Sequence, residues 1–286
     1  MSFELGVIFA FVAMLGWGFG DFFIQKSTRS IGIWTTVFII TTLGAIVLTP
    51  FAIWNASLIS VGRDIFIIGA IAYFAGAFLD LESLKEGKLD IVEPIWSFEI
   101  VSSSLLAFFI LGETVSWTQI LFIALLIFSL MLISLKTLHF ELKHLVEKGV
   151  YIAFIAAITM GAANFFIGVG SRNVDAITIK WGMNLFLAIG SGIFMLKNNE
   201  WRGILRKIRK YKKEVVCMSI FDNSAWLAFG FSMVFAPIAI AVAISESYII
   251  IAVLLGYFVN KEKLRKHQII GLVLSIISAI YLASSI

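Results

Sequence analysis

Ten long apolar segments constrain this chain more than any other feature of its sequence. A membrane-spanning helix needs about 20 consecutive and mostly apolar residues. The chain has 286 residues, of which 60% are hydrophobic, and a soluble domain could not bury that much apolar surface. The segments are residues 5–24, 34–54, 65–84, 91–111, 119–135, 149–170, 177–196, 215–235, 238–259 and 268–284. The sequence therefore predicts an all-α polytopic membrane protein with ten transmembrane helices.

The chain repeats itself after five segments. Residues 6–29 match residues 149–172 at ten of 24 positions when the sequence is shifted by 143 residues. In this match Gly18 pairs with Gly161, and Arg29 pairs with Arg172. Further along the offset becomes 149, and Glu113 pairs with Glu262. The pattern indicates an internal duplication, with a first repeat in 1–135, a connector in 136–148 and a second repeat in 149–286.

The number of segments in each repeat decides how the repeats are related. Because five is odd, the second repeat enters the membrane from the side opposite to the first. The sequence thus predicts two inverted five-helix repeats, an architecture in which secondary transporters place their binding site at the repeat interface near the bilayer midplane.

Charged loops predict the orientation in the membrane. Counting the apolar segments in chain order, the loops that follow the first, third, fifth, seventh and ninth segments carry 19 of the 22 Lys and Arg residues. By the positive-inside rule these loops face the cytoplasm, so both termini are predicted to be non-cytoplasmic. The net charge of +4 thus reflects topology in the plasma membrane, and it gives no reason to expect a nucleic-acid partner. The expected partners are the lipid bilayer and a small-molecule substrate, and the sequence leaves the oligomeric state open.

Carboxylates inside the apolar segments are the strongest candidates for a functional site. Glu99, Asp222 and Glu246 lie within apolar segments. Asp21 lies near the end of the first segment, and the equivalent position in the second repeat is Asn164. A charged side chain at the centre of a membrane helix costs about 2.5 to 3.5 kcal/mol, so these groups are expected to face a protein interior or a wet cavity. They could bind substrate or protons there, or they could bond to other side chains and lock the helices together.

Aromatic and amide side chains accompany these carboxylates. The four tryptophans that lie deeper in the segments are expected to line the same cavity: Trp17, Trp96, Trp181 and Trp226. The predicted polar companions are Ser97, Asn164, Asn184, Asn223, Ser245 and Tyr248. Together with the four carboxylates, these residues form the predicted site for substrate or a coupling ion.

Enzyme functions find no support in the sequence. The chain contains no HExxH, CxxC, Walker A or GxSxG motif, and Cys217 is its single cysteine. The histidines lie in or beside basic loops, so we expect no metal site and no cofactor. The absence of a Walker A motif also argues against ATP-driven transport by this chain alone.

The repeated motifs resemble the EamA-like transporter family of the drug/metabolite transporter superfamily. The residues that carry the resemblance are Pro94, Gly112-Glu113 and Gln119 in the first repeat, and Pro237, Lys261-Glu262 and Gln268 in the second. Two features depart from the family pattern: Lys261 replaces a glycine, and Pro237 lies six residues earlier relative to its motif than Pro94 does. The resemblance covers nearly the whole chain and implies a ten-helix bundle around a central cavity. Many family members are drawn with cytoplasmic termini, whereas the loop charges of this chain predict non-cytoplasmic termini. We follow the loop charges.

The function that we expect is therefore secondary transport. The resemblance implies a carrier of amino acids, amines, nucleotide sugars or other metabolites, and the buried carboxylates favour an amino acid or an amine. Such a carrier would work by alternating access and could be coupled to protons. The alternative is a non-transporting membrane scaffold or a lipid-handling protein, and a scaffold would not need carboxylates inside its spans.

Overall fold

Helices make up every secondary-structure element in the part of the chain that the structure describes. The structure, a computed structural model, describes residues 2–54, 56–86, 89–135, 148–259, 261 and 263–285. In chain order the helices are α1 Ser2–Ile31, α2 Ile33–Trp54, α3 Ala56–Glu86, α4 Leu89–Trp96, α5 Phe98–Leu111, α6 Trp117–Ser134, α7 Lys148–Asn173, α8 Ala176–Lys197, α9 Ile204–Lys210, α10 Lys212–Phe235, α11 Ile238–Glu246, α12 Tyr248–Phe258 and α13 Lys266–Ser284.

Most of these helices are suited to a bilayer. Nine segments of the described residues are long and apolar enough to cross a membrane, and they coincide with nine of the ten predicted spans. Two of the nine, Pro94–Leu111 and Ile238–Phe258, extend across α4–α5 and α11–α12. The tenth predicted span lies in α3, which carries Arg63 and Asp80 along its length and is not among the nine. The protein is thus an all-helical, multi-pass membrane protein, and the count of ten spans stays a prediction.

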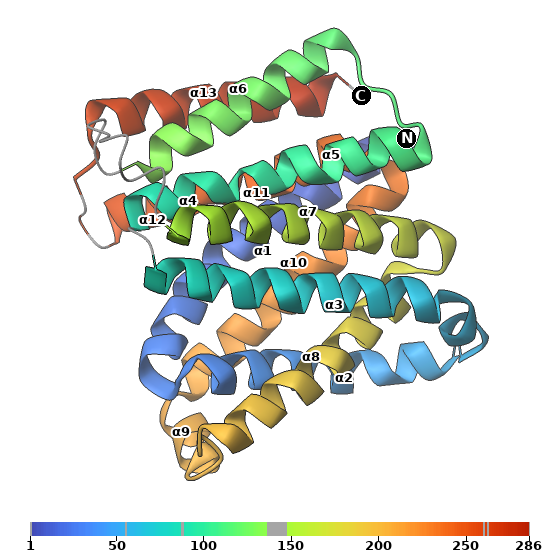
Figure 1. The fold of residues 1–286 in the computed structure, drawn as a ribbon, viewed down its shortest axis with the longest axis vertical. Helices are drawn as coiled ribbons and strands as arrows, with labels where there is room; N and C mark the ends of the chain where they lie inside the picture. The colour runs from blue at the N-terminus through green and yellow to red at the C-terminus, as the bar shows by residue number, and fades with distance from the viewer. Residues whose placement is uncertain are drawn as a thin grey trace.

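The helices of the two sequence repeats pack as equivalents. α1 packs along α10, and its counterpart α7 packs along α3, which is the counterpart of α10. α2 packs on its counterpart α8, and α6 packs on its counterpart α13, a pair that lies side by side at one edge of the bundle in Figure 1. In the same view α1 runs away from the side that holds both termini, whereas α7 runs back toward it. This packing fits an inverted repeat.

Two matched glycines let the helices of each half approach closely. A Cβ atom at Gly161 would lie 2.5 Å from the carbonyl oxygen of Glu99, so α5 rests directly on the α7 backbone. A Cβ atom at Gly18 would lie 2.4 Å from the Cβ of Ile251, so α12 rests on α1 in the same way. Small residues allow such contacts between membrane helices. The two glycines that pair in the sequence therefore make equivalent helix contacts in the fold.

The spans that carry Glu99 and Glu246 are interrupted near their middle. Ser97 separates α4 from α5, and Ser247 separates α11 from α12. Pro94, which lies shortly before the first interruption, has no N–H to donate to the preceding turn. Glu99 lies just after one interruption, and Glu246 lies just before the other. Discontinuous helices of this kind form the binding sites of many inverted-repeat transporters.

The second half contains one additional element. α9 lies between α8 and α10, whereas α3 begins two residues after the end of α2. The six extra residues of the second repeat fit in this connection. The division of the chain into 1–135, 136–148 and 149–286 stays a prediction, because most of the connector and Glu262 lie outside the described residues.

Candidate functional site

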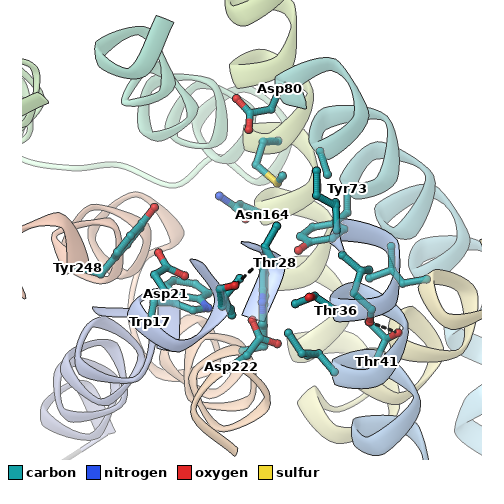
Figure 2. Close-up of a pocket in the computed structure, with 18 of the residues that line it drawn as sticks. Trp17, Asp21, Thr28, Thr36, Thr41, Tyr73, Asp80, Asn164, Asp222 and Tyr248 are labelled. Atoms are coloured by element: carbon teal, nitrogen blue, oxygen red, sulfur yellow. Dashed lines mark hydrogen bonds between the residues drawn. The ribbon is translucent and has the colours of Figure 1, made fainter. Parts of the chain in front are cut away.

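A cavity of about 400 Å³ lies between the two halves of the bundle. Its walls come from α1, α2, α3, α4 and α5 of the first half and from α7, α8, α10, α11 and α12 of the second. α6 and α13 pack against each other instead. Figure 2 shows side chains from both halves surrounding this one space, among them Asp21, Tyr73 and Asp222.

Nine of the fourteen predicted site residues line this cavity. They come from helices that are far apart in the sequence, and both halves contribute. They are Trp17, Asp21, Trp96, Glu99, Asn164, Asp222, Trp226, Glu246 and Tyr248. The expectation that buried carboxylates turn away from lipid thus agrees with where the structure places them.

Three predicted residues, Trp181, Asn184 and Asn223, do not line the cavity, and we correct their placement. The Asn184 Nδ2 donates to Asn223 Oδ1 at 3.0 Å, and the Asn223 Nδ2 donates to the Ile40 carbonyl oxygen at 3.1 Å. The Trp181 indole N–H donates to the Thr49 hydroxyl at 3.1 Å. These bonds join α8 to α10 and α2, because a polar side chain within a span is stabilised when a neighbouring helix satisfies it. Ser97 and Ser245 are also buried away from the cavity lining.

The two carboxyl groups of the interrupted spans meet in the cavity. Glu99 and Glu246 are 3% and 8% exposed, and their side chains hydrogen-bond to each other. The Asn164 Nδ2 lies 3.4 Å from Glu99 Oε2, to which it donates. A hydrogen bond between two carboxyl groups needs a proton on one of them, since an ionised carboxylate can only accept. The cavity therefore brings together one acidic residue from each half.

Aromatic rings form a second part of the wall. The ring centroids of Trp17 and Trp226 lie 4.9 Å apart in an edge-to-face arrangement, and Tyr73 lies 5.2 Å from Trp226. Tyr248 lies 6.0 Å from Trp17. Such rings offer both apolar surface and a negative π face, which attracts a cationic group.

Comparison with known proteins identifies the fold and the family. The sequence profile of the EamA-like transporter family matches residues 4–135 and 147–284. This chain belongs to the EamA-like transporter family. A crystal structure of a protein that is 15% identical has the same fold, with a TM-score of 0.79 over 98% of this chain and 96% of that chain. A search of curated proteins gave no match.

Membership of this family makes the chain a membrane transporter of the drug/metabolite transporter superfamily. Among the described residues, no group of three or more His, Cys, Asp and Glu side chains is arranged to hold a metal ion. The cavity of this EamA-like transporter offers charge, hydrogen bonding and aromatic contact.

Lys180 is a site residue that the predicted set left out. It lines the cavity and is 7% exposed, and its Nζ lies 5.2 Å from the ring centroid of Trp226. Asp222 attracts it electrostatically, but within the described part of the chain Nζ makes no hydrogen bond and no ion pair within 4 Å. The signal in the sequence was its position, because Lys180 is the one basic residue inside a predicted span.

The other residues missed by sequence reasoning are Tyr73, Asp80 and three threonines. Thr28, Thr36 and Thr41 line the cavity although each hydroxyl donates to the carbonyl oxygen four residues earlier, at 2.7 to 2.8 Å. Threonines in membrane helices often make this bond, so the presence of a threonine in a predicted span does not indicate that it lines a cavity.

The cavity of this EamA-like transporter extends toward one end of the bundle. It reaches Thr28, close to the end of α1, and Ile33, the first residue of α2. We call this end the basic side, because it holds the α1–α2 and α8–α10 connections. We call the opposite end, which holds both termini in Figure 1, the terminal side.

Proposed function

We propose that this protein is a secondary transporter of the plasma membrane that carries a small amphipathic metabolite with both an amino and a carboxylate group, such as an amino acid. The observation that carries the proposal is the cavity between the halves, which contains a carboxyl pair, an aromatic wall and one lysine. Transport follows alternating access, with the two halves rocking about this site.

Acidic and aromatic residues favour a cationic group on the substrate. Five carboxyl side chains line the cavity, against Lys180 as the one basic residue in the lining: Asp21, Asp80, Glu99, Asp222 and Glu246. A cation over an aromatic face gains about 0.5 to 2 kcal/mol, with the larger values in desolvated sites. An ammonium group therefore finds both opposite charge and a π surface here.

Lys180 favours a carboxylate on the same substrate. A buried ammonium group is costly unless it is paired and hydrogen-bonded. The described residues give Nζ an aromatic face and the field of Asp222 but no direct hydrogen bond. A substrate carboxylate would supply the missing acceptor. Simple amines lack this group, whereas amino acids carry it.

The carboxyl pair offers a way to couple transport to protons. If Glu99 and Glu246 share a proton through their mutual hydrogen bond, a substrate ammonium could displace it. Release of that proton to one side and its return from the other would exchange protons for substrate.

Uptake into proteoliposomes tests the substrate class. We expect zwitterionic amino acids to be transported in preference to amines without a carboxylate and to acids without an amine. In Lys180→Met, uptake of the zwitterion should fall about tenfold to a hundredfold, because a hydrogen bond to a charged group contributes about 1.5 to 3 kcal/mol. The matched control is Lys148→Met, since Lys148 is a surface residue paired with Glu86 at 3.4 Å. Equal uptake of zwitterions by both variants would contradict the assignment of Lys180.

Cysteine labelling in intact cells tests the orientation. We propose that both termini are outside, as the loop charges indicate. In a Cys217→Ser background, a membrane-impermeant reagent should label Ser2→Cys but not Leu205→Cys, although Leu205 is 69% exposed. Labelling at position 205 without labelling at position 2 would reverse the orientation.

A further inference from the structure

A network around Arg172 and Glu113 lies at the terminal side of the bundle. The Arg172 Nη1 pairs with a Glu113 carboxylate oxygen, and the other guanidinium nitrogens donate to the carbonyl oxygens of Met233 at 2.5 Å and Ala236 at 2.8 Å. The second Glu113 oxygen accepts from the N–H of Ile238 at 2.8 Å. We call these five residues the latch. It joins the α5–α6 connection, the end of α7 and the α10–α11 connection.

An apolar layer lies between the latch and the cavity. Along α10, Trp226 lines the cavity, Phe229 and Met233 are fully buried, and Ala236 is bonded in the latch. The ten steps from Trp226 to Ala236 span about 15 Å at the rise of an α-helix, which is nearly three turns. A solute in the cavity therefore meets buried apolar side chains before it reaches the terminal side.

A second cavity lies on the outer side of this layer. It measures about 360 Å³, and its lining includes Phe3, Glu113, Thr114 and Arg172. The side chains of Arg172 and Glu113 are 26% and 15% exposed, so they border this space. The latch therefore lies between two cavities, one at the centre of the bundle and one at the terminal side.

Repeat-equivalent helices differ at the two ends of the bundle. On α1, Thr28 lines the central cavity and Arg29 is exposed. At the equivalent positions of α7, Ser171 is buried and Arg172 is bonded in the latch. The two equivalent helix ends thus differ: the end of α1 borders the central cavity, whereas the end of α7 is bonded in the latch. An inverted-repeat transporter held in one state of its cycle shows such a difference.

We propose that the latch is the closure of the terminal side, and that breaking it opens the central cavity there. This proposal rests on the alternating access of the proposed function and adds the residues that hold one end shut. The ion pair joins a connection of the first half to helices of the second half, so rocking of the halves must separate it. Removing one partner leaves the other charge without compensation, and this favours a state in which water reaches it.

Accessibility of a cysteine in the central cavity tests the proposal without any substrate. Ala77 lines the cavity and is small, so Ala77→Cys in the Cys217→Ser background serves as the reporter. With the latch intact, an impermeant reagent should label it from the basic side and only slowly from the terminal side. Arg172→Gln and Glu113→Gln should each raise terminal-side labelling about tenfold, because a loss of about 1.4 kcal/mol from the closed state shifts the equilibrium by that factor.

Two further variants make the result decisive. Arg63→Gln removes an arginine at the start of α3 that is 66% exposed and pairs with Asp64, so it should leave the labelling unchanged. Arg172→Lys keeps the charge but loses the forked geometry, so it should give an intermediate rate and also serves if the glutamine variants fold poorly. Terminal-side labelling equal to that of Arg63→Gln in every latch variant would overturn the proposal. Altered labelling with no uptake of zwitterions would instead refute the proposed function and leave the latch in place.

Discussion

Replacing Glu246 with Gln should reduce substrate uptake at least about thirtyfold, since removing the carboxylate that pairs with a buried substrate ammonium costs about 2 to 5 kcal/mol. Glutamine keeps the size of the side chain and can still hydrogen-bond to Glu99, so the fold should persist. It cannot release a proton, and it cannot pair with a substrate cation. Glu99→Gln should have a similar effect, because the two groups act as one pair.

The pH dependence of uptake shows whether the Glu99–Glu246 pair exchanges a proton for substrate or only binds the substrate cation. If the shared proton is exchanged for substrate, uptake by the unmodified protein should respond to a pH gradient, whereas both glutamine variants should respond little. The control is Glu86→Gln, because Glu86 is exposed and pairs with Lys148 outside the cavity. Rates and pH profiles that are unchanged in both cavity variants would leave Glu99 and Glu246 as groups that only lock the helices together.

Introducing a methyl group at Gly161 should destabilise the bundle by about 1 to 3 kcal/mol or more, the usual cost of overpacking a core. In Gly161→Ala the new Cβ would lie 2.5 Å from the Glu99 carbonyl oxygen, which belongs to backbone that cannot rotate away. α5 must then move from α7 and take Glu99 with it. We expect a lower midpoint of thermal unfolding in detergent, together with reduced uptake.

Gly192→Ala is the matched control for this prediction. A Cβ atom at Gly192 would lie 3.4 Å from the nearest atom of Phe38, an ordinary packing distance. The same change in a helix of the same bundle should therefore leave the unfolding midpoint almost unchanged. Equal unfolding midpoints for the two variants would show that the contact between α5 and α7 is looser than the structure indicates.

The sequence by itself determined the class of the protein and the burial of its intramembrane carboxylates Glu99 and Glu246. The apolar segments predicted ten spans, nine of which coincide with observed helical segments, and the pairing of Gly18 with Gly161 was part of the evidence for two repeats. The high cost of charge in lipid was enough to predict that Glu99, Asp222 and Glu246 turn inward. These inferences succeeded because they depend on local composition and on the repetition of a pattern, and both can be read directly from the sequence.

Only the tertiary structure decided which polar residues face the cavity and which bond the helices. Asn184 and Asn223 are polar residues within spans, as expected of site residues, yet they bond to each other between α8 and α10. Lys180, on α8 as well, lines the cavity. Successive residues of a helix are turned by about 100°, so a neighbour in sequence points to a different partner. The direction in which a span faces its neighbours depends on all the other helices, and for that reason the latch around Arg172 was also beyond the reach of the sequence.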